Sequence, residues 1–123
     1  MRKPAIIVAA ASAVALVLGS MTIAPQAAIA ADADLVAKGK KIAENRKKGN
    51  CFTCHDYKGA HLAGNIGPPF VAMKARFPDK KKLRAKIWDA TASNPNTMMP
   101  PFGKYGVLSG KDIDAITEWV YTL

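Results

Sequence analysis

The segment GNCFTCHDY (residues 49–57) holds two cysteines, Cys51 and Cys54, followed directly by His55. No other cysteine occurs in the chain. Two thiols at this spacing can form a redox dithiol, supply half of a zinc site, close a disulfide, or anchor a haem through thioether bonds. The rest of the sequence must distinguish among these four chemistries.

Three of the four chemistries lack support elsewhere in the chain. A dithiol of the thioredoxin type needs a βαβ context, whereas a basic helical segment precedes this motif and no strand follows it. A structural zinc site takes four ligands, and His61 would be the only nearby fourth. A disulfide would close a very short loop, gain little stability from chain entropy, and leave His55 unexplained. The motif therefore favours one covalent haem c, with Cys51 and Cys54 as thioether anchors and His55 as the proximal iron ligand.

A sixth iron ligand is expected from the proline-rich segment NPNTMMPPFGKYG (residues 94–106). His61 lies too close to His55 in the chain to reach the opposite face of the macrocycle, and Met73 has the helical spacing of a core residue. Met98 and Met99 lie far enough downstream to cross the distal face. We expect Met99, directly before the prolines, to be the distal ligand. Ligation by Met and His raises the reduction potential and fills the coordination sphere, which favours electron transfer over oxygen or peroxide chemistry.

The turn GNIGPPF (residues 64–70) has two possible roles. The second ring nitrogen of an iron-binding histidine usually donates to a carbonyl or a carboxylate, which fixes the tautomer. A proline carbonyl of this turn is suited to accept that hydrogen bond. Alternatively, the prolines only shape the turn.

The elements expected to position these residues are helices. Apolar periodicity and capping residues predict a helix over 34–45, started by Asp32 or Asp34, and a short helix opened by the prolines and ending at residue 76. A third helix is expected over 79–93, with Asp79 as its cap, and a last one begins after Ser109. No convincing pair of strands appears. The fold class is therefore all-α, with long connections.

The N-terminal residues have the pattern of a secretory signal peptide. Residues 2–3 are basic, residues 5–19 form an uncharged apolar run, and Ala28 and Ala30 offer an A-x-A cleavage site. We expect cleavage near Ala30, export to the periplasm, and a mature cytochrome domain over 31–123 that does not insert into a membrane. The alternative is a retained membrane anchor, because the apolar run is nearly long enough to span a bilayer.

The order of these motifs resembles that of class I cytochromes c: C-x-x-C-H, a Gly-Pro turn, and a Met-Pro loop between terminal helices. The resemblance implies that the N- and C-terminal helices cross beside the haem. Gly39 and either Trp119 or Tyr121 would lie at that crossing. It also implies that the Pro68 carbonyl accepts a hydrogen bond from the proximal histidine.

A closer resemblance covers roughly residues 49–123. The segments GNIGPPF, RFPDKKKLRAKIWDATASNPNTMMPPFGKYGVL and EWVYTL are similar to the monohaem SoxX subunits of SoxAX sulfur-oxidation cytochromes. This implies a periplasmic heterodimer with a SoxA-type subunit, an L-cysteine S-thiosulfotransferase-type enzyme that links thiosulfate oxidatively to a cysteine of the carrier SoxY–SoxZ. Electrons would then pass to a downstream acceptor. The alternative is a free-standing soluble cytochrome c that shuttles electrons.

The resemblance and the cysteine count together locate the sulfur chemistry outside this chain. Both thiols would be consumed as thioethers, so no cysteine remains to act as the sulfur nucleophile. The reactive cysteine is therefore expected on the partner, and this chain would be the electron-accepting subunit, with no catalytic residue of its own.

The chain is strongly basic, with 18 Lys and Arg against 9 Asp and Glu and a net charge of +9. The basic residues gather at 38–48 and at 80–86. They either form solvated helix faces or attract an acidic protein surface, such as a SoxA-type subunit or a soluble acceptor, toward the haem. Nucleic acid is not an expected partner in the periplasm.

Overall fold

The computed structural model describes residues 26–123, and this part of the chain is helical without strands. The all-α fold class expected from the sequence is confirmed. The apolar run at 5–19 lies outside the described residues. The elements, in chain order, are α1 (Gln26–Glu44), the 3₁₀ turn η1 (Cys51–Thr53), α2 (Met73–Arg76), α3 (Lys80–Trp88), the 3₁₀ turn η2 (Ala90–Ala92) and α4 (Gly110–Val120).

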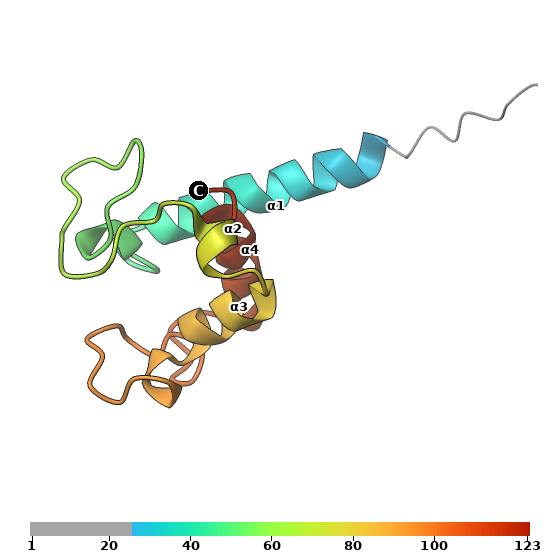
Figure 1. Cartoon of the computed structure of the whole chain (residues 1–123). Helices are drawn as coiled ribbons and strands as arrows, with labels where there is room; N and C mark the ends of the chain where they lie inside the picture. Colours follow the sequence, from blue (N-terminus) through green and yellow to red (C-terminus); the bar gives the residue numbers. More distant parts are fainter. Residues whose placement is uncertain (1–25) are drawn as a thin grey trace, which may run out of the picture.

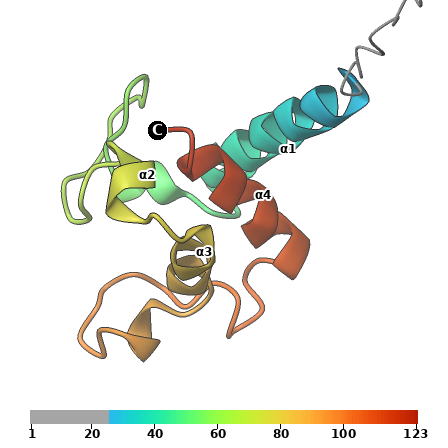
Figure 2. The same ribbon diagram turned by 45° about the vertical axis from the view of Figure 1, so that its right-hand side comes forward.

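The first and last helices cross each other at a glycine. Figure 1 shows α1 passing directly against α4, and the turned view in Figure 2 shows the same contact. A Cβ atom on Gly39 would lie 1.9 Å from the backbone oxygen of Ala115, so the two backbones can approach this closely only because Gly39 has no side chain. Trp119 is buried one helical turn further along α4. The crossing inferred from the resemblance is therefore present, with Trp119 as its aromatic residue.

The core is built around the apolar face of α4. Ile113, Ile116 and Val120 follow the helical period and are almost completely buried. Partners come from α1, α2, α3 and the connecting segments, and include Ile42, Ala43, Tyr57, Met73, Leu83, Ile87 and Leu108. Burial of this apolar surface is the main contribution that the polypeptide itself makes to the stability of the fold.

Two of the expected helix caps are confirmed. The Asp79 side chain accepts a hydrogen bond from the Lys81 backbone nitrogen at 2.9 Å, at the start of α3. The Ser109 hydroxyl accepts from the Asp112 backbone nitrogen at 3.2 Å and donates to the Asp112 carboxylate at 2.9 Å. These bonds satisfy backbone donors that have no partner within the first turn.

Three helix boundaries differ from the expectation. Helix α1 begins at Gln26 instead of residue 34, because the alanine-rich stretch before Asp32 itself has high helix propensity. Helix α3 ends at Trp88, because Asp89 is extended and its side chain instead caps η2 through the Thr91 nitrogen. Helix α2 begins at Met73, after Ala72 in the left-handed region, so the preceding prolines shape the turn without entering the helix.

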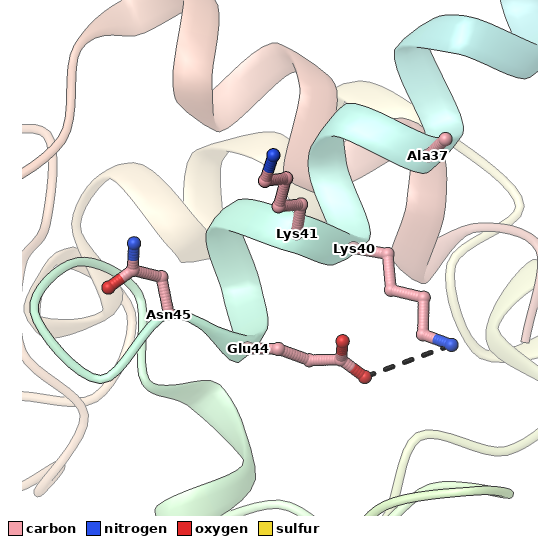
Figure 3. A pocket seen from close by; sticks show the side chains of 5 residues that line it. All are labelled: Ala37, Lys40, Lys41, Glu44 and Asn45. Carbon is pink, nitrogen blue, oxygen red and sulfur yellow. Dashed lines mark ion pairs between the residues drawn. The ribbon is translucent and has the colours of Figure 1, made fainter.

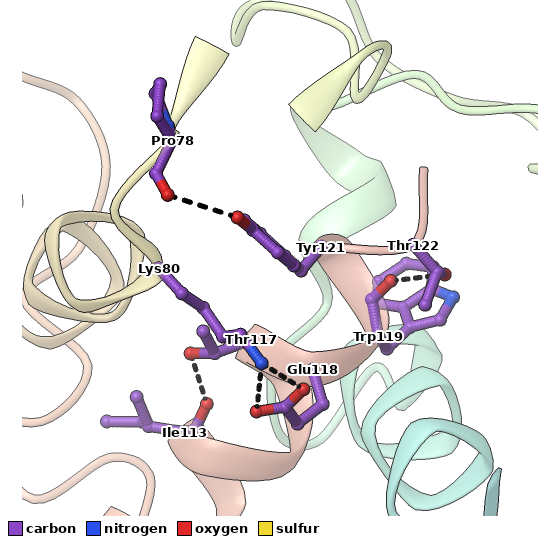
Figure 4. A network of polar contacts seen from close by, with 8 residues as sticks. All are labelled: Pro78, Lys80, Ile113, Thr117, Glu118, Trp119, Tyr121 and Thr122. Atoms are coloured by element: carbon purple, nitrogen blue, oxygen red, sulfur yellow. Dashed lines mark hydrogen bonds and ion pairs between the residues drawn. The ribbon is translucent and has the colours of Figure 1, made fainter. Parts of the chain in front are cut away.

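A network of polar contacts joins α3 and the C-terminus to α4 (Figure 4). The Lys80 ammonium contacts both carboxylate oxygens of Glu118, at 2.7 and 2.9 Å. The Tyr121 hydroxyl donates to the Pro78 carbonyl at 3.3 Å. Arg84 forms an ion pair with Asp114 on the same face of α4. Two members of the basic 80–86 cluster therefore bind acidic residues within the molecule.

Among the helices of residues 26–123, none combines the length and apolar character that crossing a membrane requires.

Candidate functional site

A cavity of about 830 Å³ lies between the segment that carries the cysteines and the segment that carries the methionine pair. In Figure 1 these are the green segment beyond the end of α1 and the orange segment beyond α3. The volume is in the range of cofactor and ligand sites. The walls are mainly apolar and include Phe70, Met73, Phe77, Leu83, Ile87, Phe102, Leu108, Ile116 and Val120.

The cysteine motif forms one wall of this cavity. Asn50 has a left-handed backbone (φ 48°), and the chain then turns through η1. The backbone nitrogens of Cys54 and His55 both donate to the Cys51 carbonyl, at 3.2 and 2.9 Å. This tight turn places Cys51, Cys54 and His55 together on the cavity wall, each partly buried.

The Cys51 thiol differs from that of a reactive dithiol. Both Cys51 and Cys54 are free, so the disulfide considered above is not formed. Burial raises the pKa of Cys51 to about 12, whereas reactive dithiols have a lowered thiol pKa. Within residues 26–123, no group of three or more His, Cys, Asp or Glu side chains is placed to hold a metal ion.

The imidazole of His55 is oriented by the Gly-Pro turn. Nδ1 of His55 lies 2.7 Å from the carbonyl oxygen of Pro68, the proline that the resemblance pointed to. When Nδ1 is the donor, Nε2 is the nitrogen that carries the free lone pair and can bind a metal. The Gly67 backbone approaches the ring so closely that a Cβ there would lie 2.4 Å from Cε1 of His55.

The structure separates the two neighbouring methionines. Met99 is partly buried, packs against the hydrophobic core and lines the cavity. Its backbone nitrogen donates to the Thr97 hydroxyl at 3.2 Å. Met98 also borders the cavity but is 78% exposed. Of the other ligand candidates, His61 is exposed and does not line the cavity, while Met73 is a buried wall residue whose sulfur lies 3.4 Å from Nη1 of Arg76.

The charged side chains that line the cavity are all basic: Arg46, Lys48, Arg76 and Lys86. No Asp or Glu residue contributes to the lining. Haem carries two carboxylates, and burying carboxylates is costly unless cations or hydrogen-bond donors surround them. Asn50 also borders this space, and its buried side-chain oxygen has no hydrogen-bond partner among the described residues. From the sequence, the basic clusters were expected to form solvated helix faces or to attract an acidic protein surface, and Arg76 was not singled out among them.

The residues present fit a haem c. Two thiols, an imidazole with a free Nε2 and a thioether converge on one apolar cavity whose charged residues are cations. Cys51 and Cys54 can hold the vinyl edge, and His55 and Met99 can supply nitrogen and sulfur to the iron. When bound there, haem supplies reversible one-electron chemistry.

A second, smaller pocket lies on the outer face of α1 and shares none of these residues. Figure 3 shows Ala37, Lys40, Lys41, Glu44 and Asn45 around it, with an ion pair of 3.8 Å between Lys40 and Glu44. The pair is exposed and joins residues one helical turn apart. Such pairs stabilise a helix by about 0.3–0.5 kcal/mol. No cysteine, histidine or methionine lines this pocket.

Comparison with known proteins assigns the chain to a family. It is 32% identical over 76 residues to an uncharacterized lipoprotein of Aquifex aeolicus (strain VF5). That alignment covers 61% of this chain but 37% of the lipoprotein, so the chain spans well under half the length of this relative. Residues 34–120 match the family described as cytochrome c oxidase, cbb3-type, subunit III. Because this match covers most of the chain, the protein belongs to that family of class I c-type cytochrome domains, which bind haem c and transfer electrons.

Proposed function

We propose that the protein is a periplasmic monohaem cytochrome and the electron-accepting subunit of a SoxAX-type complex. The observation that carries its electron-transfer role is the single cavity that Cys51, Cys54, His55 and Met99 line together. The similarity of residues 49–123 to SoxX subunits, including the long segment from Arg76 to Gly106, supports the narrower assignment. The family match supports the assignment as a haem-binding cytochrome. The SoxA-type partner has to be tested by experiment.

Each site residue has a defined task in this proposal. Cys51 and Cys54 hold one haem through thioether bonds, and His55 binds its iron through Nε2. The Pro68 carbonyl keeps the Nδ1 proton in place and so maintains that tautomer. Met99 completes the coordination, which excludes oxygen and peroxide from the iron and favours a high reduction potential.

The reaction of the complex determines what this chain must do. Joining thiosulfate to a thiol forms one S–S bond, releases the thiol proton, and releases two electrons. Because one haem would take up one electron at a time, the two electrons would leave through this chain in two steps or be shared with the SoxA-type partner. Both cysteines of this chain belong to the haem site, so the partner supplies the reactive sulfur and the carrier SoxY–SoxZ supplies the acceptor thiol.

Export is part of the proposal. Covalent haem attachment is expected after export, and the signal-like pattern ending near Ala30 provides for it. The Aquifex relative is described as a lipoprotein, a class of exported protein, which supports the same route. Helix α1 runs through Ala30 in the full chain, so cleavage there would shorten α1 and leave its crossing with α4 at Gly39 intact.

The test uses the full chain, expressed in a bacterium that attaches haem c in its periplasm, with and without a SoxA-type subunit. We expect one covalent haem per chain, co-purification with the SoxA-type subunit, and haem reduction when thiosulfate and SoxY–SoxZ are added. A stable, reducible monomer that does not bind the subunit would favour the free-standing shuttle. Absence of a covalent-haem spectrum would contradict both assignments.

A further inference from the structure

Phe70 stacks on the imidazole of His55. The two ring centroids are 4.4 Å apart and the planes differ by 20°, which is a stacked arrangement. The Phe70 backbone is fixed as well, because its nitrogen donates to the Asp56 carbonyl at 2.7 Å. With Gly67 also in close contact with the imidazole, the His55 ring has little room to tilt or rotate.

Tyr57 and Trp119 hold Phe70 in turn. The Tyr57 ring lies 6.2 Å from the Phe70 ring and nearly parallel to it, at 19°. Trp119 meets both rings edge-on, at 5.0 Å from Tyr57 and 6.1 Å from Phe70. Tyr57 is only 5% exposed, and its hydroxyl donates to Glu44 of α1 at 2.7 Å. A continuous set of aromatic contacts therefore runs from the helix crossing to the imidazole.

We infer that Phe70 is a positioning residue that fixes the plane of the His55 imidazole, with Tyr57 as its support. This inference rests on the proposed role of His55 as an iron ligand. The hydrogen bond to Pro68 fixes the direction of Nδ1 but acts at one atom, at the edge of the ring. The stacked Phe70 ring acts on the whole face, and it resists the tilting and twisting that a single hydrogen bond permits.

The orientation of an axial imidazole relative to the haem nitrogens determines the electronic anisotropy of ferric haem. A ring held in one plane gives a single set of g values in an electron paramagnetic resonance spectrum. A ring released from its stack samples several orientations and gives broadened or multiple signals. Positioning by Phe70 is therefore visible in a measurement that reports directly on the iron ligands.

The experiment compares Phe70→Leu with Phe77→Leu in the haem-loaded protein. Phe77 is a matched control, because it is also partly buried and lines the same cavity but does not stack on His55. We expect Phe70→Leu to lose the single set of g values and to shift the midpoint potential, while Phe77→Leu keeps the wild-type signal. Phe70→Tyr, which retains a flat ring, should preserve the wild-type spectrum. Tyr57→Leu should change it in the same direction as Phe70→Leu, and Tyr57→Phe should not.

The outcomes separate this inference from the proposal on which it rests. A wild-type protein without a low-spin covalent haem would overturn the ligand assignment and the role of Phe70 together. A normal wild-type signal that is unchanged in Phe70→Leu would overturn the role of Phe70 alone. If Phe70→Leu does not accumulate, Phe70→Met is the second non-aromatic variant, and the same comparison applies to it.

Discussion

The Gly39 backbone on α1 lies against the Ala115 carbonyl on α4, and a Cβ at Gly39 would come within 1.9 Å of that oxygen. Replacement of Gly39 by alanine must therefore push the two helices apart. We expect Gly39→Ala to destabilise the haem-loaded protein by about 3 kcal/mol, the upper part of the range for overpacked cores. Denaturant unfolding followed by circular dichroism measures this difference.

Gly110 provides the control for that substitution. A Cβ there would meet nothing nearer than an Arg84 nitrogen at 3.7 Å, which is an ordinary contact. Gly110→Ala should change the stability by less than about 0.5 kcal/mol. Equal effects of the two substitutions would show that the helix crossing is not the sensitive contact.

We expect replacement of Met98 and replacement of Met99 to have different effects on the visible spectrum. Met99→Ala should remove the sulfur–iron charge-transfer band and lower the reduction potential, because the proposed distal ligand is the partly buried Met99 thioether. Met98→Ala should retain both properties, since its side chain is 78% exposed. Visible spectroscopy and redox titration of the two variants measure the difference, and loss of the band in Met98→Ala would shift the ligand by one residue.

We expect the basic residues that border the cavity to increase the rate of association with an acidic partner. Arg46 and Lys48 border the cavity and make no ion pair within the described residues, whereas Lys80 and Arg84 already bind acidic residues of α4. We expect the double variant Arg46→Glu/Lys48→Glu to slow association with a SoxA-type subunit or an acidic acceptor by about tenfold or more at low ionic strength. Stopped-flow kinetics at several salt concentrations measures this rate.

The matched control reverses two positive charges at positions away from the cavity. Lys81 and Lys82 on α3 are exposed and do not line the cavity. Lys81→Glu/Lys82→Glu should slow association much less, provided that both variants retain wild-type haem content. Equal slowing in both variants would mean that net charge, and not the cavity rim, governs the encounter.

We expect the contribution of Asp89 to the stability of the fold to depend on pH. Hydrogen bonds from Thr91 and from the Lys104 ammonium, which lies 3.0 Å away, lower the pKa of Asp89 below its ordinary value. A lowered folded-state pKa stabilises the protein above the unfolded-state pKa, near pH 4, and this stabilisation disappears as the pH falls through the lowered value. Asp89→Asn should therefore reduce the thermal midpoint at pH 7 and should reduce it less at pH 3.

Asp34→Asn is the control for this pH dependence. Asp34 is exposed on α1 and forms no ion pair within the described residues. Its replacement should leave the difference between the two pH values as in the wild type. Parallel changes in both variants would indicate a general charge effect instead of the local contacts of Asp89.

Sequence alone determined the features that depend on neighbouring residues. The sequence predicted the C-x-x-C-H spacing, the caps at Asp79 and Ser109, and the apolar face of α4, because each depends on residues within one or two turns of the chain. Helix ends were harder to predict. The start of α1 and the end of α3 depend on competition between local propensity and alternative caps, as Asp89 shows by capping η2 instead of extending α3.

Tertiary structure decided the relationships between residues distant in the chain. It separated the partly buried Met99 from the exposed Met98, and it selected the Pro68 carbonyl as the partner of His55. It also showed that Lys80 and Arg84 pair with α4, while Arg46 and Lys48 border the cavity. Stacking of Phe70 on His55 was not readable from the sequence, because it depends on how the Gly-Pro turn folds back over the cysteine motif. These contacts join separate elements, so their geometry exists only once the elements have packed together.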